Sequence, residues 1–170
     1  MKKDELSLTD VFKCTYDKFD NGVLLVSAGS DGRKNIMTIG WGLIGILWRE
    51  PVFMVAVRDS RYTHELIEET NEFTVNIPGD DIGEAIKLCG SVSGRDHDKF
   101  KETNLTAVAG KNVQVPIISE CLLHFECTVI GKTQVTPEKL SEEVLQSCYP
   151  RDDFHTLYCG KILSVYGEEC

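Results

Sequence analysis

Short apolar runs separated by turns constrain the fold of this chain more than any other feature of its sequence. Residues 23–28 and 52–57 are nearly continuous apolar runs, each of a length suited to a buried strand. Residues 73–77 and 121–131 instead alternate apolar and polar side chains, as strands do when one face lies on the core. These patterns predict a protein built mainly from β-strands.

The remaining segments add turns, helices and one further strand. The sequence Gly-Ser-Asp-Gly at residues 29–32 is a turn signal, and it predicts a hairpin with residues 35–43 as the returning strand. Ser60 is expected to be the N-cap of a helix that runs to Thr70. A last strand is expected near residues 154–165, and short helices near residues 8–16, 82–88, 97–101 and 137–145.

The order of these elements indicates the fold class. The first helix is expected to lie on the core through apolar residues at helical spacing, which are Leu8, Val11, Phe12 and Tyr16. Because no regular βαβ repeat occurs, the elements favour a mainly antiparallel barrel with peripheral helices. A chain of 170 residues suits one domain, which we expect to cover residues 1–170.

Charge and cysteine content limit the partners and the compartment. The chain has 18 Lys and Arg against 27 Asp and Glu, a formal net charge of −9, which argues against binding nucleic acid or an anionic membrane. Its seven cysteines contain no C-x-x-C spacing, so we expect core thiols rather than a disulfide framework or a zinc site. The polar start predicts no signal peptide, and no run of about 18 apolar residues could cross a membrane. We therefore expect a cytoplasmic protein.

Two motifs that suggest chemistry are better explained as structural features. Residues 40–45 have the dinucleotide-binding spacing G-x-G-x-x-G, but Pro51 and a strand pattern follow too soon for the helix that such a site needs. His155 and Cys159 would lie about 13 Å apart on one strand, too far for a catalytic pair, so Cys159 is expected in the core. The four histidines are scattered and predict no metal site. His124 is expected on a solvated or interface side of its strand.

Two donor-rich segments could hold an anion. Residues 58–63 lie between a strand and a helix, where the first helical N–H groups lack partners and favour negative charge. Ser60, Arg61 and Thr63 add hydroxyl and guanidinium donors, although an ordinary N-cap beside a surface arginine explains these residues equally well. Residues 91–100 are also rich in donors, with a solvated loop as the equal alternative.

Five segments of the chain occur in the order and at the spacing of one known family. They are residues 35–41, 58–63, 72–78, 93–100 and 155–162. Together they resemble the flavin reductase-like family, whose members include flavoredoxin and bind FMN in a split β-barrel, an antiparallel Greek-key fold. The resemblance extends over residues 21–165.

The resemblance implies an FMN site on these segments. Ser60, Arg61 and Thr63 would hold the phosphate, which agrees with the anion site inferred from the residues themselves. Lys99 would contact the phosphate or the flavin ring, and Asn76 would lie beside the ribityl chain. The full set of cofactor-binding residues that the resemblance implies is Asn35, Met37, Thr38, Ile39, Trp41, Ser60, Arg61, Tyr62, Thr63, Asn76, Ser93, Gly94 and Lys99.

The ring side of the implied site involves residues 37–39 and His155. Residues 37–39 would line the isoalloxazine with backbone groups, and Trp41 would pack near the ring or at a dimer interface. His155 matches the family histidine near the flavin face where a nicotinamide would dock, and is the candidate catalytic residue. Many flavin reductases carry Gly-Asp just before this histidine, whereas this chain has Asp153 and Phe154.

The function that the resemblance implies is an FMN-binding oxidoreductase that reduces flavin with NADH or NADPH. Two alternatives stay open. One is electron transfer of the flavoredoxin type without direct NAD(P)H oxidation, and the other is non-catalytic ligand binding in the same barrel. Because FMN sites of this family lie between subunits, we expect a homodimer with FMN near the interface. The sequence does not identify the redox partner.

Overall fold

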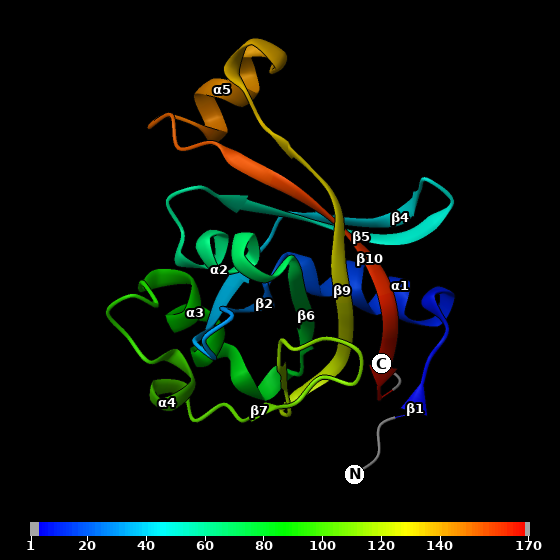
Figure 1. The fold of residues 1–170 in the computed structure, drawn as a ribbon. Helices are drawn as coiled ribbons and strands as arrows, with labels where there is room; N and C mark the ends of the chain where they lie inside the picture. The colour runs from blue at the N-terminus through cyan, green and yellow to red at the C-terminus, as the bar shows by residue number, and fades with distance from the viewer. Residues whose placement is uncertain (1–3, 169–170) are drawn as a thin grey trace.

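One large antiparallel sheet organises the molecule (Figure 1). The computed structural model describes residues 4–168, so the first residues of the polar start and Cys170 lie outside the described part. The strands are β1 (Asp4–Glu5), β2 (Val23–Ala28), β3 (Lys34–Ile39), β4 (Gly42–Leu47), β5 (Glu50–Arg58), β6 (Glu72–Pro78), β7 (Ala107–Val108), β8 (Ile117–Ile118), β9 (Cys121–Gln134) and β10 (His155–Gly167). The helices are α1 (Leu8–Phe19), α2 (Tyr62–Thr70), α3 (Gly83–Ser91), α4 (Lys99–Thr103) and α5 (Glu142–Cys148), with short 3-10 turns at Asp80–Ile82 and Pro137–Lys139.

The strand order confirms the predicted fold class. The main sheet runs β3–β2–β6–β9–β10–β5–β4, with β1 beside β10, and all of these pairings are antiparallel. β6, β9 and β10 are neighbours, and β5 lies beside β10, which is a Greek-key arrangement. β9 and β10 extend beyond the rest of the sheet and carry α5 at their far end (Figure 1).

The returning strand expected over residues 35–43 is instead broken at residues 40–41. β3 ends at Ile39, and β4 pairs with β5 at the opposite end of the sheet order. Residues 40–41 therefore join the two end strands, and the Trp41 carbonyl accepts a hydrogen bond from the Ala56 amide of β5 (3.4 Å). No helix follows the glycines at residues 40–45, as expected.

The start of α2 differs from the prediction. Arg61 occupies the N-cap position, and no side chain caps the first turn. The Ser60 hydroxyl donates instead to Asp153 Oδ2 at 2.7 Å. This partner is within reach because the chain before β10 folds back onto the end of β5, where Arg58 donates to the carbonyls of Cys148 and Asp153.

Helix α1 packs on the core, but not through all the residues expected. Val11 and Cys14 are buried, whereas Phe12 and Tyr16 are 49% and 71% exposed. The sheet covers only part of the apolar side of this helix and leaves Phe12 and Tyr16 outside the core. Phe12 and Tyr16 border an outer groove together with Leu43 of β4.

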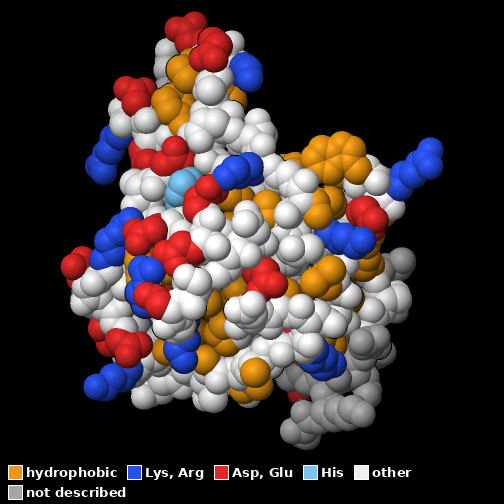
Figure 2. Space-filling model, viewed as in Figure 1, with side chains coloured by type: hydrophobic (Ala, Val, Ile, Leu, Met, Phe, Trp, Pro, Cys, Tyr) orange, Lys and Arg blue, Asp and Glu red, His pale blue; other side chains and the backbone are white. Residues whose placement is uncertain are grey.

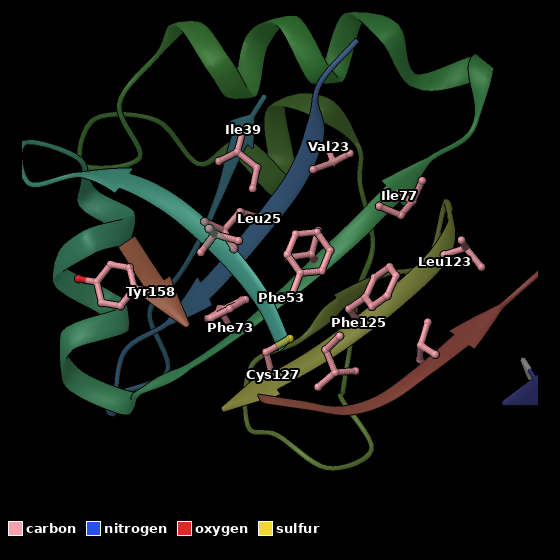
Figure 3. Packing of buried hydrophobic residues seen from close by; sticks show 14 of the residues in the cluster. Val23, Leu25, Ile39, Phe53, Phe73, Ile77, Leu123, Phe125, Cys127 and Tyr158 are labelled. Carbon is pink, nitrogen blue, oxygen red and sulfur yellow. The ribbon is translucent and has the colours of Figure 1, made fainter. Parts of the chain in front are cut away.

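Two cores lie on opposite faces of β2, which explains its continuous apolar run. Val23 and Leu25 enter the main core, whereas Leu24 and Val26 enter a second core with α3, α4 and the segment that follows them. Aromatic rings fill the main core (Figure 3). The rings of Phe53 and Phe125 meet nearly edge to face, with centroids 5.1 Å apart, a favourable aromatic geometry.

The polar faces of β6 and β9 are buried, so the expectation of a solvated or interface His124 is wrong. A covering segment, residues 110–118, lies over these faces. Its backbone groups form hydrogen bonds with the polar side chains of β6 and β9. The fully buried Glu126 carboxylate accepts from the backbone amides of Lys111 and Asn112. Four buried polar residues belong to this face, which are Thr74, Asn76, His124 and Glu126.

The described cysteines mostly agree with the expectation of core thiols. Cys89, Cys121, Cys127 and Cys159 are buried thiols, and Cys148 is a half-buried thiol. Cys14 differs from that expectation because it is disulfide-bonded. Among residues 4–168 no helix is both long and apolar enough to span a membrane.

The close approach of β10 to the core generates a test of the fold. A Cβ added at Gly160 would overlap the Phe73 ring and lie 2.8 Å from Cys127 Cβ. We expect Gly160→Ala to lower the free energy of unfolding by about 1–3 kcal/mol through overpacking, measured by urea denaturation. The matched control is Gly45→Ala, whose Cβ would meet nothing within 4 Å and should leave stability nearly unchanged. Equal stability of the two variants would contradict this packing.

Candidate functional site

Two adjoining hollows lie where β3, the start of α2 and the segment between α3 and α4 come together. Their volumes are about 570 Å³ and 500 Å³, the solvent at their mouths included. Met37, Thr38 and Arg61 line both hollows. The first hollow also contains the predicted residues Asn35, Ser60, Tyr62, Thr63, Ser93, Gly94 and Lys99, and the second contains Ile39, Trp41 and His155.

Asn76 is the predicted site residue that the structure does not bring to either hollow. Its amide nitrogen donates to the Leu24 carbonyl (3.4 Å) and to Thr74 Oγ1 (3.0 Å). Its oxygen accepts from the Ile118 amide (3.0 Å) and lies 2.9 Å from His124 Nδ1. Because the side chain is fully buried and its amide is used inside the protein, the structure places Asn76 in the core, away from both hollows.

The start of α2 presents free donors to the first hollow. Arg61 is exposed, and its guanidinium makes no hydrogen bond or ion pair within residues 4–168. The uncapped first turn adds N–H groups and the positive end of the helix dipole. The Thr63 hydroxyl accepts from Asn35 Nδ2 at 2.8 Å, so its own proton remains for a ligand. The Ser60 proton, in contrast, is directed to Asp153.

Lys99 adds a buried positive charge to the same hollow. It is 5% exposed, and its Nζ donates to the carbonyls of Ile36 (2.9 Å) and Cys89 (2.8 Å). An ammonium group has three N–H donors, so one is left over. Burial lowers the pKa of Lys99 and raises that of the neighbouring Cys89 thiol to about 11. The site therefore holds a desolvated cation beside a neutral thiol.

The segment between α3 and α4 closes over the first hollow. Arg95 donates to the Ser60 carbonyl (3.1 Å) and to Glu65 Oε2 (3.2 Å), and its guanidinium lies over the Tyr62 ring. Gly94 must be glycine, because a Cβ there would overlap the Asn35 amide and lie 3.1 Å from Tyr62 Cδ1. These contacts attach the segment to α2 and form a wall of the hollow.

The free edge of β3 supplies backbone groups. β3 is an end strand that pairs with β2 alone, and the Ile36 carbonyl points outward, where it accepts from Lys99. In an antiparallel strand the backbone groups alternate between the two edges with a period of two. The N–H and C=O of Thr38 therefore lie on the same open edge, in the part of β3 that lines both hollows.

Aromatic side chains form the wall of the second hollow. The Trp41 and His155 rings have centroids 4.9 Å apart, and Tyr149 Oη lies 2.9 Å from His155 Nδ1. Burial, together with the charge of Arg58, lowers the pKa of His155 to about 4. His155 is therefore neutral at pH 7 and can offer a ligand a hydrogen bond but no positive charge.

Some lining residues were missed by the sequence analysis. Cys89, Gly90 and Val92 line the first hollow, and Ala56 and Arg58 line the second. Arg58 lay inside a recognised donor-rich segment and could have been included. Cys89, Gly90 and Ala56 lie outside the donor-rich segments, and Val92 has no polar side chain. Among the described residues no group of three His, Cys, Asp or Glu side chains could hold a metal ion.

Comparison with known proteins agrees with this geometry. A family model described as "Flavin reductase like domain" matches residues 16–170. A protein of Archaeoglobus fulgidus is 32% identical over 133 residues, which are 78% of this chain. The chain spans only 65% of the length of that relative.

Solved structures share the fold. The flavoredoxin of Desulfovibrio vulgaris (Miyazaki F) is 28% identical, with a TM-score of 0.69 over 87% of this chain and 69% of that chain. An FMN-binding domain of a flavin reductases-like enzyme from Shewanella baltica is 18% identical, with a TM-score of 0.69 over 98% of this chain and 78% of its own. The predicted split β-barrel is thereby confirmed. The chain belongs to the flavin reductase-like domain family.

Proposed function

We propose that the chain binds FMN across the first and second hollows and acts as a flavin-dependent oxidoreductase. The observation that carries the proposal is the pair of cations facing the first hollow, Arg61 and Lys99, neither of which has a carboxylate partner within residues 4–168. Two unpaired cations, a free Thr63 hydroxyl and an open helix N-terminus suit a phosphate dianion. The aromatic wall of the second hollow suits a flat ring.

The relatives support this choice of ligand. One solved neighbour is a flavoredoxin, and another is described as FMN-binding. In this assignment the residues of the first hollow hold the phosphate end. Residues 37–39, Trp41 and His155 lie along the ring, and Tyr62, Ser93 and Gly94 close over the cofactor. Asn76 takes no part.

The protein's contribution is binding, orientation and electrostatics. A bound flavin would supply the redox chemistry. The N–H and C=O of Thr38 would orient the edge of the flavin ring. The remaining N–H donor of Lys99 would stabilise the negative charge of the FMN phosphate in a site that excludes water. Trp41 would exclude water from the ring.

We assign NADH or NADPH as the reductant, with the nicotinamide docked on the His155 side. A neutral His155 supports this role, because it can offer the nicotinamide a hydrogen bond without adding a positive charge. The second candidate is electron transfer of the flavoredoxin type, which the 28% identity with a flavoredoxin favours. The physiological acceptor is not assigned.

We also propose that the chain forms a homodimer with FMN near the interface. An apolar face on α1 and the β4–β5 hairpin supports this assembly, and Figure 2 shows hydrophobic side chains gathered over the hairpin. Large contiguous apolar patches mark interaction surfaces, and this face adjoins the second hollow at Gly40. Phe12, Tyr16 and Leu43 border its groove, and Ile46 and Trp48 are further exposed apolar side chains of the hairpin.

The buried lysine provides a sharp test of the FMN site. We expect Lys99→Met to weaken FMN binding about tenfold or more, because a charge-assisted contact is lost. The dissociation constant is measured by quenching of flavin fluorescence. Lys101→Met is the matched control: Lys101 lies on the same helix α4 but is exposed and lines neither hollow, so its affinity should equal that of wild type. Equal affinities for both variants would remove Lys99 from the site.

Reduction by nucleotide separates the two candidate functions. FMN-loaded protein mixed with NADH or NADPH under nitrogen should lose its visible flavin absorbance, because the nicotinamide can dock beside His155. Bleaching by dithionite alone, with neither nucleotide effective, would contradict the reductase assignment and favour electron transfer. If the chain binds FMN tightly but the bound flavin exchanges electrons with no donor or acceptor, non-catalytic ligand binding would be favoured.

The apolar face predicts the oligomeric state. Ile46 is 75% exposed in one chain, so Ile46→Glu should leave the protomer folded but place a charge in the interface. We expect the wild type to sediment as a dimer and Ile46→Glu as a monomer with weakened FMN binding. Val108→Glu, on the exposed surface of β7, is the control and should stay dimeric. A monomeric wild type would contradict the assembly.

A further inference from the structure

A third hollow opens beside the second and is lined by arginines. It lies between the end of β5, the start of α2 and the chain after α5, and has a volume of about 670 Å³, open solvent included. Arg58 and Arg61 line both the second and third hollows, and Arg151 lines the third alone. The third hollow thus adjoins the second hollow, whose wall contains His155 and Trp41.

The charge of this hollow is opposite to that of the chain as a whole. Three arginines face it, and within residues 4–168 Asp153 is the only acidic residue that lines it. The Asp153 carboxylate accepts from the Ser60 hydroxyl, and Arg58 donates to backbone carbonyls, which carry no full negative charge. A chain of net charge −9 therefore has a locally positive pocket at this place.

Arg151 is the guanidinium group of this hollow that stays available when FMN is bound, because Arg61 is assigned to the FMN phosphate. Arg151 is exposed at the turn that precedes β10, and like Arg61 it has no hydrogen bond or ion pair of its side chain within residues 4–168. Guanidinium groups bind phosphate oxygens through two parallel hydrogen bonds. Arg151, in a hollow that Arg58 and Arg61 make positive, is accordingly suited to a second phosphate group.

We propose that the third hollow binds a phosphate group of the small molecule that exchanges electrons with the flavin, with Arg151 as the residue that selects a phosphorylated co-substrate. This inference rests on the proposed function. The FMN phosphate is assigned to the first hollow, where Lys99 lies, so the third hollow serves a second anion. The third hollow adjoins the second hollow, which contains His155. A molecule with its phosphate group in the third hollow could therefore have its reactive part in the second hollow.

Calorimetric titration of FMN-loaded protein with inorganic pyrophosphate tests this proposal. We expect saturable binding that weakens roughly tenfold in Arg151→Ala, because one charge-assisted contact is lost, and that weakens further as salt is raised. FMN absorbance is recorded throughout and should show that the flavin stays bound. Lys139→Ala removes an exposed cation from the same excursion between β9 and β10 but outside the hollow, and should bind pyrophosphate as wild type does.

Parallel titrations with NAD⁺ and NADP⁺ identify the source of the phosphate. Weaker binding of either nucleotide to Arg151→Ala supports a dinucleotide co-substrate, whereas an effect on pyrophosphate alone supports another phosphorylated molecule. Pyrophosphate that does not bind, or binds equally to wild type and Arg151→Ala, overturns the proposal even when FMN is bound. A chain that takes up no FMN contradicts the proposed function instead, and pyrophosphate titration of that chain still tests the hollow.

Discussion

The connection at residues 40–41 is the constraint on which the rest of the structure depends. It joins β3 to β4, the two end strands of the sheet order, and its Trp41 carbonyl is bonded to β5. Curving the sheet in this way brings the open edge of β3 close to the ends of β5 and β10. The donors of α2 and the aromatic wall with His155 thus come to one place, although they are far apart in the sequence.

Lys99 is a site residue whose burial lowers the stability of the fold. A buried cation without a carboxylate partner costs free energy, because its two carbonyl acceptors replace only part of its hydration. The buried Glu126 carboxylate, in contrast, is well supplied with hydrogen-bond donors. It accepts from the backbone amides of Lys111 and Asn112, and also from the side chains of Asn112 and Tyr166. The contrast between these two residues distinguishes a structural charge from one that a bound anion would complete.

Much of the fold and of the site follows from local patterns. The apolar run of β2 and the alternation of β6 and β9 predicted those strands, and the segment around Arg61 predicted donors that the structure places at the first hollow. Expectations failed where tertiary contacts override local chemistry. The polar faces that contain Asn76 and His124 are covered by residues 110–118, and Ser60 found Asp153 in place of a helix cap. The third hollow could not be predicted, because Arg58 and Arg151 are 93 positions apart and meet only through the fold.

FMN binding is tested most directly by an equilibrium titration of the flavin-free, 170-residue chain with FMN, followed by flavin fluorescence and the visible spectrum. We expect saturable quenching that ends at one FMN per chain, with a shifted and structured absorbance band as the ring leaves water. Flavin fluorescence that stays unquenched at protein concentrations well above the micromolar range would contradict FMN binding by this chain.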